Sequence, residues 1–124
     1  MSEEPTRVLV VDDEAPIRNL LGEVLGRAGY EAVPAGDAAR ALDILSQGRI
    51  DLVLLDLHMP GPADGEDLLY LLRDRGDEVP IIIVSGYVDD DATTSHPDCV
   101  HAVIKKPIRV EPFLRTIEQV IALS

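Results

Sequence analysis

Four short, mostly aliphatic runs, each followed at once by polar residues, limit the folds open to this chain more than any other feature. The runs cover residues 8–11 before Asp12 and Asp13, 53–55 before Asp56, 81–84 before Ser85, and 100–104 before Lys105 and Lys106. Such runs are typical of parallel strands buried on both faces. Parallel strands end along one edge of a sheet, where open α/β sheets bind their ligands. The polar residues therefore predict a common site at that edge.

Segments with helical spacing lie between these runs. Pro16 suits a first helical turn, Gly29 suits a helix stop, and Asp37 is available as an N-cap. The alternation of strand and helix predicts an α/β protein, with a three-layer, doubly wound, five-stranded parallel sheet. Apolar residues recur at intervals of three and four within residues 17–28, 38–45, 68–72 and 113–121.

The sequence of the second predicted strand indicates the order of the strands in the sheet. Residues 31–35 are short, polar at the start and contain Pro34, and proline in a sheet is confined to edges because it cannot donate to the ladder. The flavodoxin-like order 2-1-3-4-5 places the second strand at an edge, so that order is predicted. Residues 89–97 should form the fourth helix but have almost no apolar stripe. A short or disordered fourth helix is expected there.

Length and composition exclude several classes of protein. The 124 residues predict a single domain over residues 1–124. The net charge of −12 argues against direct nucleic-acid binding, which needs clustered lysines and arginines. No apolar run approaches the ~20 residues of a membrane span, and the acidic N-terminus does not resemble a signal peptide. A lone cysteine, Cys99, forms no internal disulfide. A cytoplasmic protein without membrane association is expected.

The acidic residues predict a metal site. Asp12, Asp13 and Asp56, brought together at one edge, would repel one another by about 4 kcal/mol per pair at ~4 Å and an effective dielectric of ~20. A cation relieves this repulsion, and hard oxygen ligands suit Mg²⁺, with Mn²⁺ as a substitute. Singly, these aspartates would be read as turn and cap residues. Acids on two strand ends, with a hydroxyl and an ammonium on two others, favour the site.

A carboxylate in such a site can also attack phosphorus, which would give Asp56 the role of a nucleophile. Phosphoryl transfer depends mainly on positioning and on neutralising charge. The Ser85 hydroxyl and one lysine ammonium could each meet a phosphoryl oxygen. Strand alternation turns only one of Lys105 and Lys106 toward the site. Lys106 is chosen because it directly precedes Pro107.

Over essentially its whole length, the chain resembles the response-regulator receiver domains (the CheY-like superfamily) of bacterial two-component signalling. The segment VLVVDDEAPIRNLL matches Asp12 and Asp13 to the Mg²⁺-binding acids of that family. DLVLLDLHMPGPADGEDLL matches Asp56 to the phosphoacceptor, and IIIVSGY and VIKKPI match Ser85 and Lys106 to its hydroxyl residue and its lysine. Each motif is loose alone, but four in order at matching separations are specific.

The resemblance implies further properties. The backbone carbonyl of His58 is expected to bind the metal, and the Lys106-Pro107 bond is expected to be cis. A sensor histidine kinase or a histidine phosphotransfer protein would donate the phosphoryl group. A downstream effector protein or an attached domain would read the signal, and self-association into a homodimer occurs in this family. The chain would not be an enzyme beyond its own phosphorylation and dephosphorylation.

One departure from the family concerns the read-out of the signal. Val103 stands three residues before the lysine, where the family usually carries an aromatic switch residue. A reordering of residues 89–97 is hypothesised to carry the signal instead. Two alternative functions stay open. One is a pseudo-receiver that binds proteins and never takes phosphate. The other is a magnesium-dependent phosphatase with Asp12 as nucleophile, although that class prefers an aspartate where this chain has Glu14.

Overall fold

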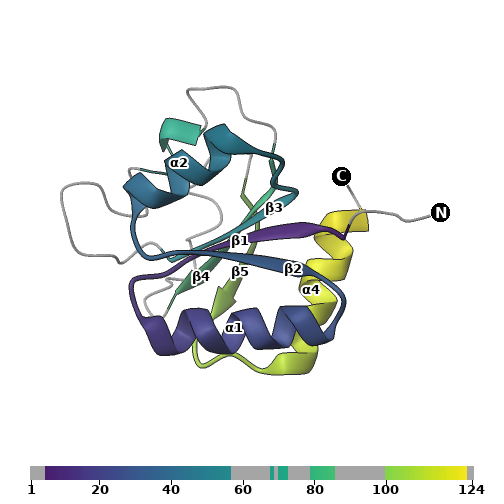
Figure 1. Ribbon diagram of the computed structural model, residues 1–124. Coiled ribbons are helices and arrows are strands. Elements are labelled where there is room, and N and C mark those ends of the chain that lie inside the picture. Colours follow the sequence, from purple (N-terminus) through teal and green to yellow (C-terminus); the bar gives the residue numbers. More distant parts are fainter. Residues whose placement is uncertain (1–4, 57–67, 69, 73–78, 86–99, 123–124) are drawn as a thin grey trace.

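Five parallel strands form one sheet in the order β2-β1-β3-β4-β5, at the centre of the fold (Figure 1). The computed structural model describes residues 5–56, 68, 70–72, 79–85 and 100–122. The predicted strand order is confirmed, and β2, which contains Pro34, lies at one edge. The strands are β1 Arg7–Val11, β2 Glu31–Ala35, β3 Leu52–Leu55, β4 Ile81–Ser85 and β5 Val100–Lys105. The helices are α1 Ala15–Arg27, α2 Ala38–Gln47 and α4 Val110–Ala122.

Alternate residues of the strands pack on opposite faces of the sheet, which produces the predicted three layers. In β1, Val8 and Val10 pack with α1 and α4, whereas Leu9 and Val11 pack with α2. The central strands β3 and β4 alternate in the same way. Leu68 and residues 70–72 are also helical, and Leu68 packs on the face of the sheet that α2 covers. Because both faces of the inner strands are covered, β1, β3 and β4 are aliphatic at almost every position.

The helix ends follow the local signals in the sequence. Pro16 lies in the first turn of α1, and Gly29 follows the helix with φ +93°, a conformation that strains other residues. The side chain of Asp37 accepts a hydrogen bond of 2.8 Å from the backbone N–H of Arg40 and caps α2.

The buried stripe of α1 is narrower than the sequence pattern predicted. Leu21 and Leu25 are buried against the sheet, but Leu20 is 48% exposed and Ala28 is also exposed. Successive residues of a helix are rotated by about 100°, so Leu20 turns away from the face that Leu21 buries. Ala28 is the C-cap residue, beyond the last helical turn of α1.

Some expectations fall outside the described residues, namely those on residues 89–97, on His58 and on Cys99. Within the described part of the chain, none of the helices has the length and apolarity needed to cross a membrane.

Candidate functional site

Asp12 and Asp56 each lie one residue beyond the end of a strand and still belong to the hydrogen-bond ladder. The Asp12 backbone N–H donates to the Ala35 carbonyl at 3.1 Å, which extends the pairing of β1 with β2. The Asp56 N–H donates to the Val11 carbonyl at 2.9 Å, which extends the pairing of β3 with β1. Both residues are buried, at 2% and 5% exposure. The sheet therefore fixes the backbone of both acids.

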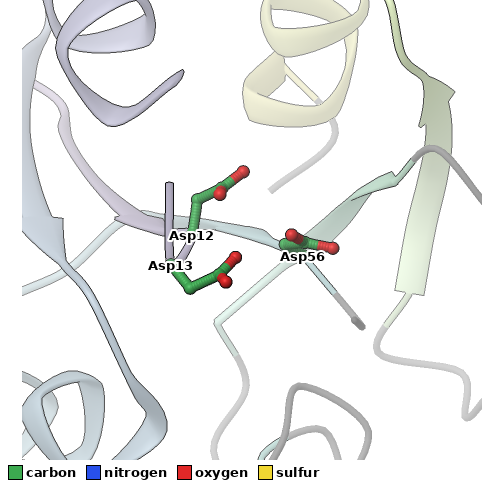
Figure 2. A group of neighbouring side chains, drawn as sticks. All are labelled: Asp12, Asp13 and Asp56. Atoms are coloured by element: carbon green, nitrogen blue, oxygen red, sulfur yellow. The ribbon is translucent and has the colours of Figure 1, made fainter. Parts of the chain in front are cut away.

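The carboxylates of Asp12, Asp13 and Asp56 converge at this edge of the sheet (Figure 2). One oxygen from each lies within 4.8 Å of the other two, and Asp13 is the exposed member. At that separation each pair of negative charges would repel by a few kcal/mol at an effective dielectric of ~20. Three converging carboxylate oxygens, open to water on the Asp13 side, are a donor set that suits a hard divalent cation.

Lys106 places an ammonium group beside the two buried acids. Its Nζ lies 2.8 Å from Oδ2 of Asp12 and 3.5 Å from Oδ2 of Asp56. Burial alone would lower the pKa of Lys106, but the hydrogen bond to Asp12 and the charges of both acids outweigh burial and raise that pKa above its ordinary value. The ammonium therefore stays charged and offsets part of the repulsion among the acids.

The register of β5 separates the two neighbouring lysines. Lys105 pairs with Ser85 at the end of β4, and its side chain is exposed. Lys106, one residue on, turns toward Asp12 and Asp56. The Lys106-Pro107 bond is cis, as the resemblance implied. Ser85 ends β4 at the same edge as the acids, while its side chain and the whole of His58 lie outside the description.

Two hydrogen bonds near the acids were not predicted from the sequence. The Glu14 backbone N–H donates to Oδ1 of Asp12 at 2.9 Å, and a guanidinium nitrogen of Arg18 donates to the Asp12 carbonyl oxygen at 2.6 Å. Arg18 lies one helical turn beyond Glu14, so a long side chain there can reach back to the loop before α1. That spacing is the only clue that the sequence offers.

The chain belongs to the response regulator receiver domains of two-component systems, because residues 8–118 match the model of that family. It is 39% identical over 85 residues to sporulation initiation phosphotransferase F of Bacillus subtilis (strain 168), and the match covers 68% of each chain. It is also 40% identical over 81 residues to response regulator MprA of Mycobacterium sp. (strain KMS), which covers 65% of this chain but only 35% of that relative.

A solved structure extends the likeness to the fold. Response regulator protein TrrA from Thermotoga maritima, solved in complex with Mg²⁺-BeF, superposes with a TM-score of 0.82 at 30% sequence identity. That likeness covers 93% of this chain and 98% of the other. The sheet order and the family match together confirm the fold class predicted from the sequence.

Proposed function

We propose that residues 1–124 form one phosphoacceptor receiver domain, which takes a phosphoryl group onto Asp56 and then switches a protein-interaction surface. The observation that supports this proposal is the convergence of three carboxylate oxygens within 4.8 Å, with the Lys106 ammonium beside Asp56. A phosphoacceptor needs a nucleophilic carboxylate, a place for a divalent cation and a further positive charge for the phosphoryl oxygens. Asp56, the acid cluster and Lys106 meet these three needs.

The proposed reaction moves a phosphoryl group from phosphohistidine to Asp56. A carboxylate oxygen of Asp56 attacks phosphorus and forms the P–O bond of an aspartyl phosphate while the P–N bond to the donor imidazole breaks. The imidazole nitrogen keeps the electron pair of that bond and takes up a proton. Lys106 neutralises one phosphoryl oxygen, and the Ser85 hydroxyl donates a hydrogen bond to another. Later attack by water on phosphorus breaks the P–O bond to Asp56, releases inorganic phosphate and returns Asp56 to its carboxylate form.

The acids fit a magnesium ion. Asp12, Asp13 and Asp56 would hold it, together with the backbone carbonyl of His58, and Mn²⁺ suits the same oxygen ligands. When bound, the ion supplies positive charge that offsets the carboxylates and the phosphoryl oxygens. The Mg²⁺-BeF complex of the Thermotoga maritima regulator supports this choice of ion, since that protein shares the fold at 30% identity.

The proposed partners follow from the reaction. A sensor histidine kinase or a histidine phosphotransfer protein supplies the phosphohistidine, in the cytoplasm. An effector protein or an attached domain receives the signal, and a second copy of the chain is one candidate for that contact. The match to the Mycobacterium regulator covers only 35% of that longer protein, which supports an attached domain as one form of the partner.

Acetyl phosphate, a small phosphodonor, tests the proposal directly. Incubation with Mg²⁺ should add the mass of one phosphoryl group to the intact chain. Asp56→Asn should abolish this addition, and omission of Mg²⁺ should greatly slow it. Asp51→Asn is the matched control, because Asp51 precedes β3 and so lies at the opposite end of that strand from Asp56. This variant should be phosphorylated like the wild type. An unmodified wild-type chain would contradict the proposal and favour a pseudo-receiver.

The same assay separates a phosphatase. Steady release of phosphate that Asp12→Asn abolishes and Asp56→Asn spares would identify Asp12 as the nucleophile.

A further inference from the structure

Arg18 differs from Lys106 because its side chain binds the backbone of Asp12 and not a carboxylate. Its guanidinium donates a hydrogen bond of 2.6 Å to the carbonyl oxygen of Asp12, not to a carboxylate. The Arg18 backbone N–H donates to the Glu14 carbonyl at 3.1 Å, so the residue is anchored in the first turns of α1. The side chain thus ties α1 to the loop that carries Asp12 and Asp13.

The Asp12 carbonyl belongs to the planar peptide unit that leads to Asp13. The amide before Asp12 is already fixed by its bond to the Ala35 carbonyl, and the Asp12 carboxylate is fixed by Glu14 and Lys106. Asp13 is exposed, and no hydrogen bond or ion pair to another described residue holds its carboxylate. The direction of the Asp13 side chain therefore depends on the orientation of the Asp12–Asp13 peptide plane.

We propose that Arg18 is a positioning residue for the metal site. Its bond to the Asp12 carbonyl sets the peptide plane that directs the Asp13 carboxylate toward Asp12 and Asp56. This inference rests on the proposed function, since it assigns Arg18 a role in the binding of a divalent cation.

A second feature, next to a different element, leaves room for the guanidinium. Gly36 directly follows β2, and a Cβ atom there would lie 3.2 Å from one guanidinium nitrogen of Arg18 and 3.5 Å from its Cζ. The lack of a side chain at Gly36 therefore leaves the room that the guanidinium occupies. Arg18 also lines a groove of about 290 Å³ with Val10 and Pro34, between α1 and the edge strand β2.

The charge of Arg18 and its hydrogen bond act on cation binding with opposite signs. A guanidinium near three carboxylates repels an incoming cation, so loss of the charge alone would tighten Mg²⁺ binding. Loss of the hydrogen bond from Arg18 frees the Asp12–Asp13 peptide plane to rotate. The Asp13 carboxylate then takes up several directions, and Mg²⁺ binding weakens. When a residue that orients a metal-binding side chain without itself contacting the metal is replaced, the metal affinity typically falls by about 10- to 100-fold. The sign of the change therefore identifies the role.

Isothermal titration of the full chain with MgCl₂ provides the test. Arg18→Met should raise the Kd for Mg²⁺ about tenfold, and Arg18→Lys, which keeps the charge and one donor, should restore part of the affinity. Arg27→Met is the matched control, because Arg27 lies on the same helix in an exposed ion pair with Glu23, and its Kd should stay at the wild-type value. An Arg18→Met variant that binds Mg²⁺ as tightly as the wild type, or more tightly, would overturn the inference.

Gly36→Ala probes the same contact while keeping the arginine. If Arg18→Met does not fold, the Kd of Gly36→Ala in the wild-type background carries the test, and an unchanged Kd would overturn the inference. The added methyl group should displace the guanidinium and raise the Kd by at least about twofold in the wild type, yet change nothing in Arg18→Met. Equal effects in both backgrounds would refute the contact. Absence of Mg²⁺ uptake in the wild type and in Arg27→Met would instead reject the proposed function itself, and the role of Arg18 with it.

Discussion

Replacing Lys106 by methionine should destabilise the domain and make it more dependent on a divalent cation. The ammonium lies 2.8 Å from Asp12 and 3.5 Å from Asp56, two carboxylates that are almost fully buried. At an effective dielectric of ~20 these contacts are worth about 6 and 5 kcal/mol before the cost of desolvation. Removal of one partner of a buried pair costs about 3–5 kcal/mol in practice. Since Lys106 remains partly exposed, we expect a loss of about 2–3 kcal/mol.

Urea unfolding in EDTA, followed by far-UV circular dichroism, measures this loss. Lys105→Met is the control, because Lys105 is the exposed neighbour on β5, and its free energy of unfolding should change by less than about 0.5 kcal/mol. Addition of Mg²⁺ should stabilise Lys106→Met more than the wild type, because the ion then replaces a missing charge. Equal stability of Lys106→Met and Lys105→Met in EDTA would refute the electrostatic account of the site.

Three further predictions concern the pH dependence, a hydrogen bond before β3 and the N-cap of α2. The pKa of Lys106 is raised in the folded state, so the stability that its charge contributes is complete below pH 10.5, the unfolded value. This contribution is lost as the pH rises through the higher folded-state pKa. The wild type should therefore be more stable than Lys106→Met in urea unfolding below pH 10.5, and this difference should shrink above the folded-state pKa. Asp51→Asn weakens the acceptor of the Arg7 backbone N–H at 2.8 Å and should cost about 1–2 kcal/mol in urea unfolding, against little change for Asp43→Asn on α2. Asp37→Ala removes the N-cap of α2 and should cost about 1 kcal/mol, measured in the same way.

The sequence predicted those parts of the fold that depend on local chemistry. Residues of β1 and β3 are aliphatic at nearly every position because both faces of these strands are buried, and this pattern marks parallel strands. Pro34 marked an edge strand because it lacks an N–H. Gly29 and Asp37 marked helix ends through backbone conformation and capping. Each of these signals acts within a few residues along the chain.

The rest depends on contacts between distant residues. Leu20 fits the apolar spacing of α1, but the direction of the helix over the sheet leaves it exposed. The register of β5 against β4 turns Lys106, and not Lys105, toward the acids, and in the sequence only the position of Lys106 before Pro107 indicated this choice. The contact of Arg18 with the Asp12 carbonyl depends on the path of the loop before α1, and the spacing of Arg18 from Glu14 alone does not determine that path.

The site joins distant strands through charge as well as through packing. Lys106 follows β5 and Asp56 follows β3, with β4 between them, so these two side chains connect strands that are not neighbours. Under the proposed function, a phosphoryl group on Asp56 replaces one negative charge by about two, which shifts the pull on the ammonium from Asp12 toward Asp56.

The residues that flank Lys106 in the chain lie at the surface of the molecule. Lys105 and Pro107, which flank Lys106 in the chain, line a pocket of about 340 Å³ between β5 and α4. Val103, which stands at the position of the family's switch aromatic, lines the same pocket. Under the proposed function, a movement of Lys106 toward Asp56 would pull on the backbone of β5 and would change the wall of this pocket, without an aromatic side chain that changes rotamer. The proposed phosphorylation of Asp56 would thereby bias the shape of the surface over β5 and α4, as a phosphorylation switch requires.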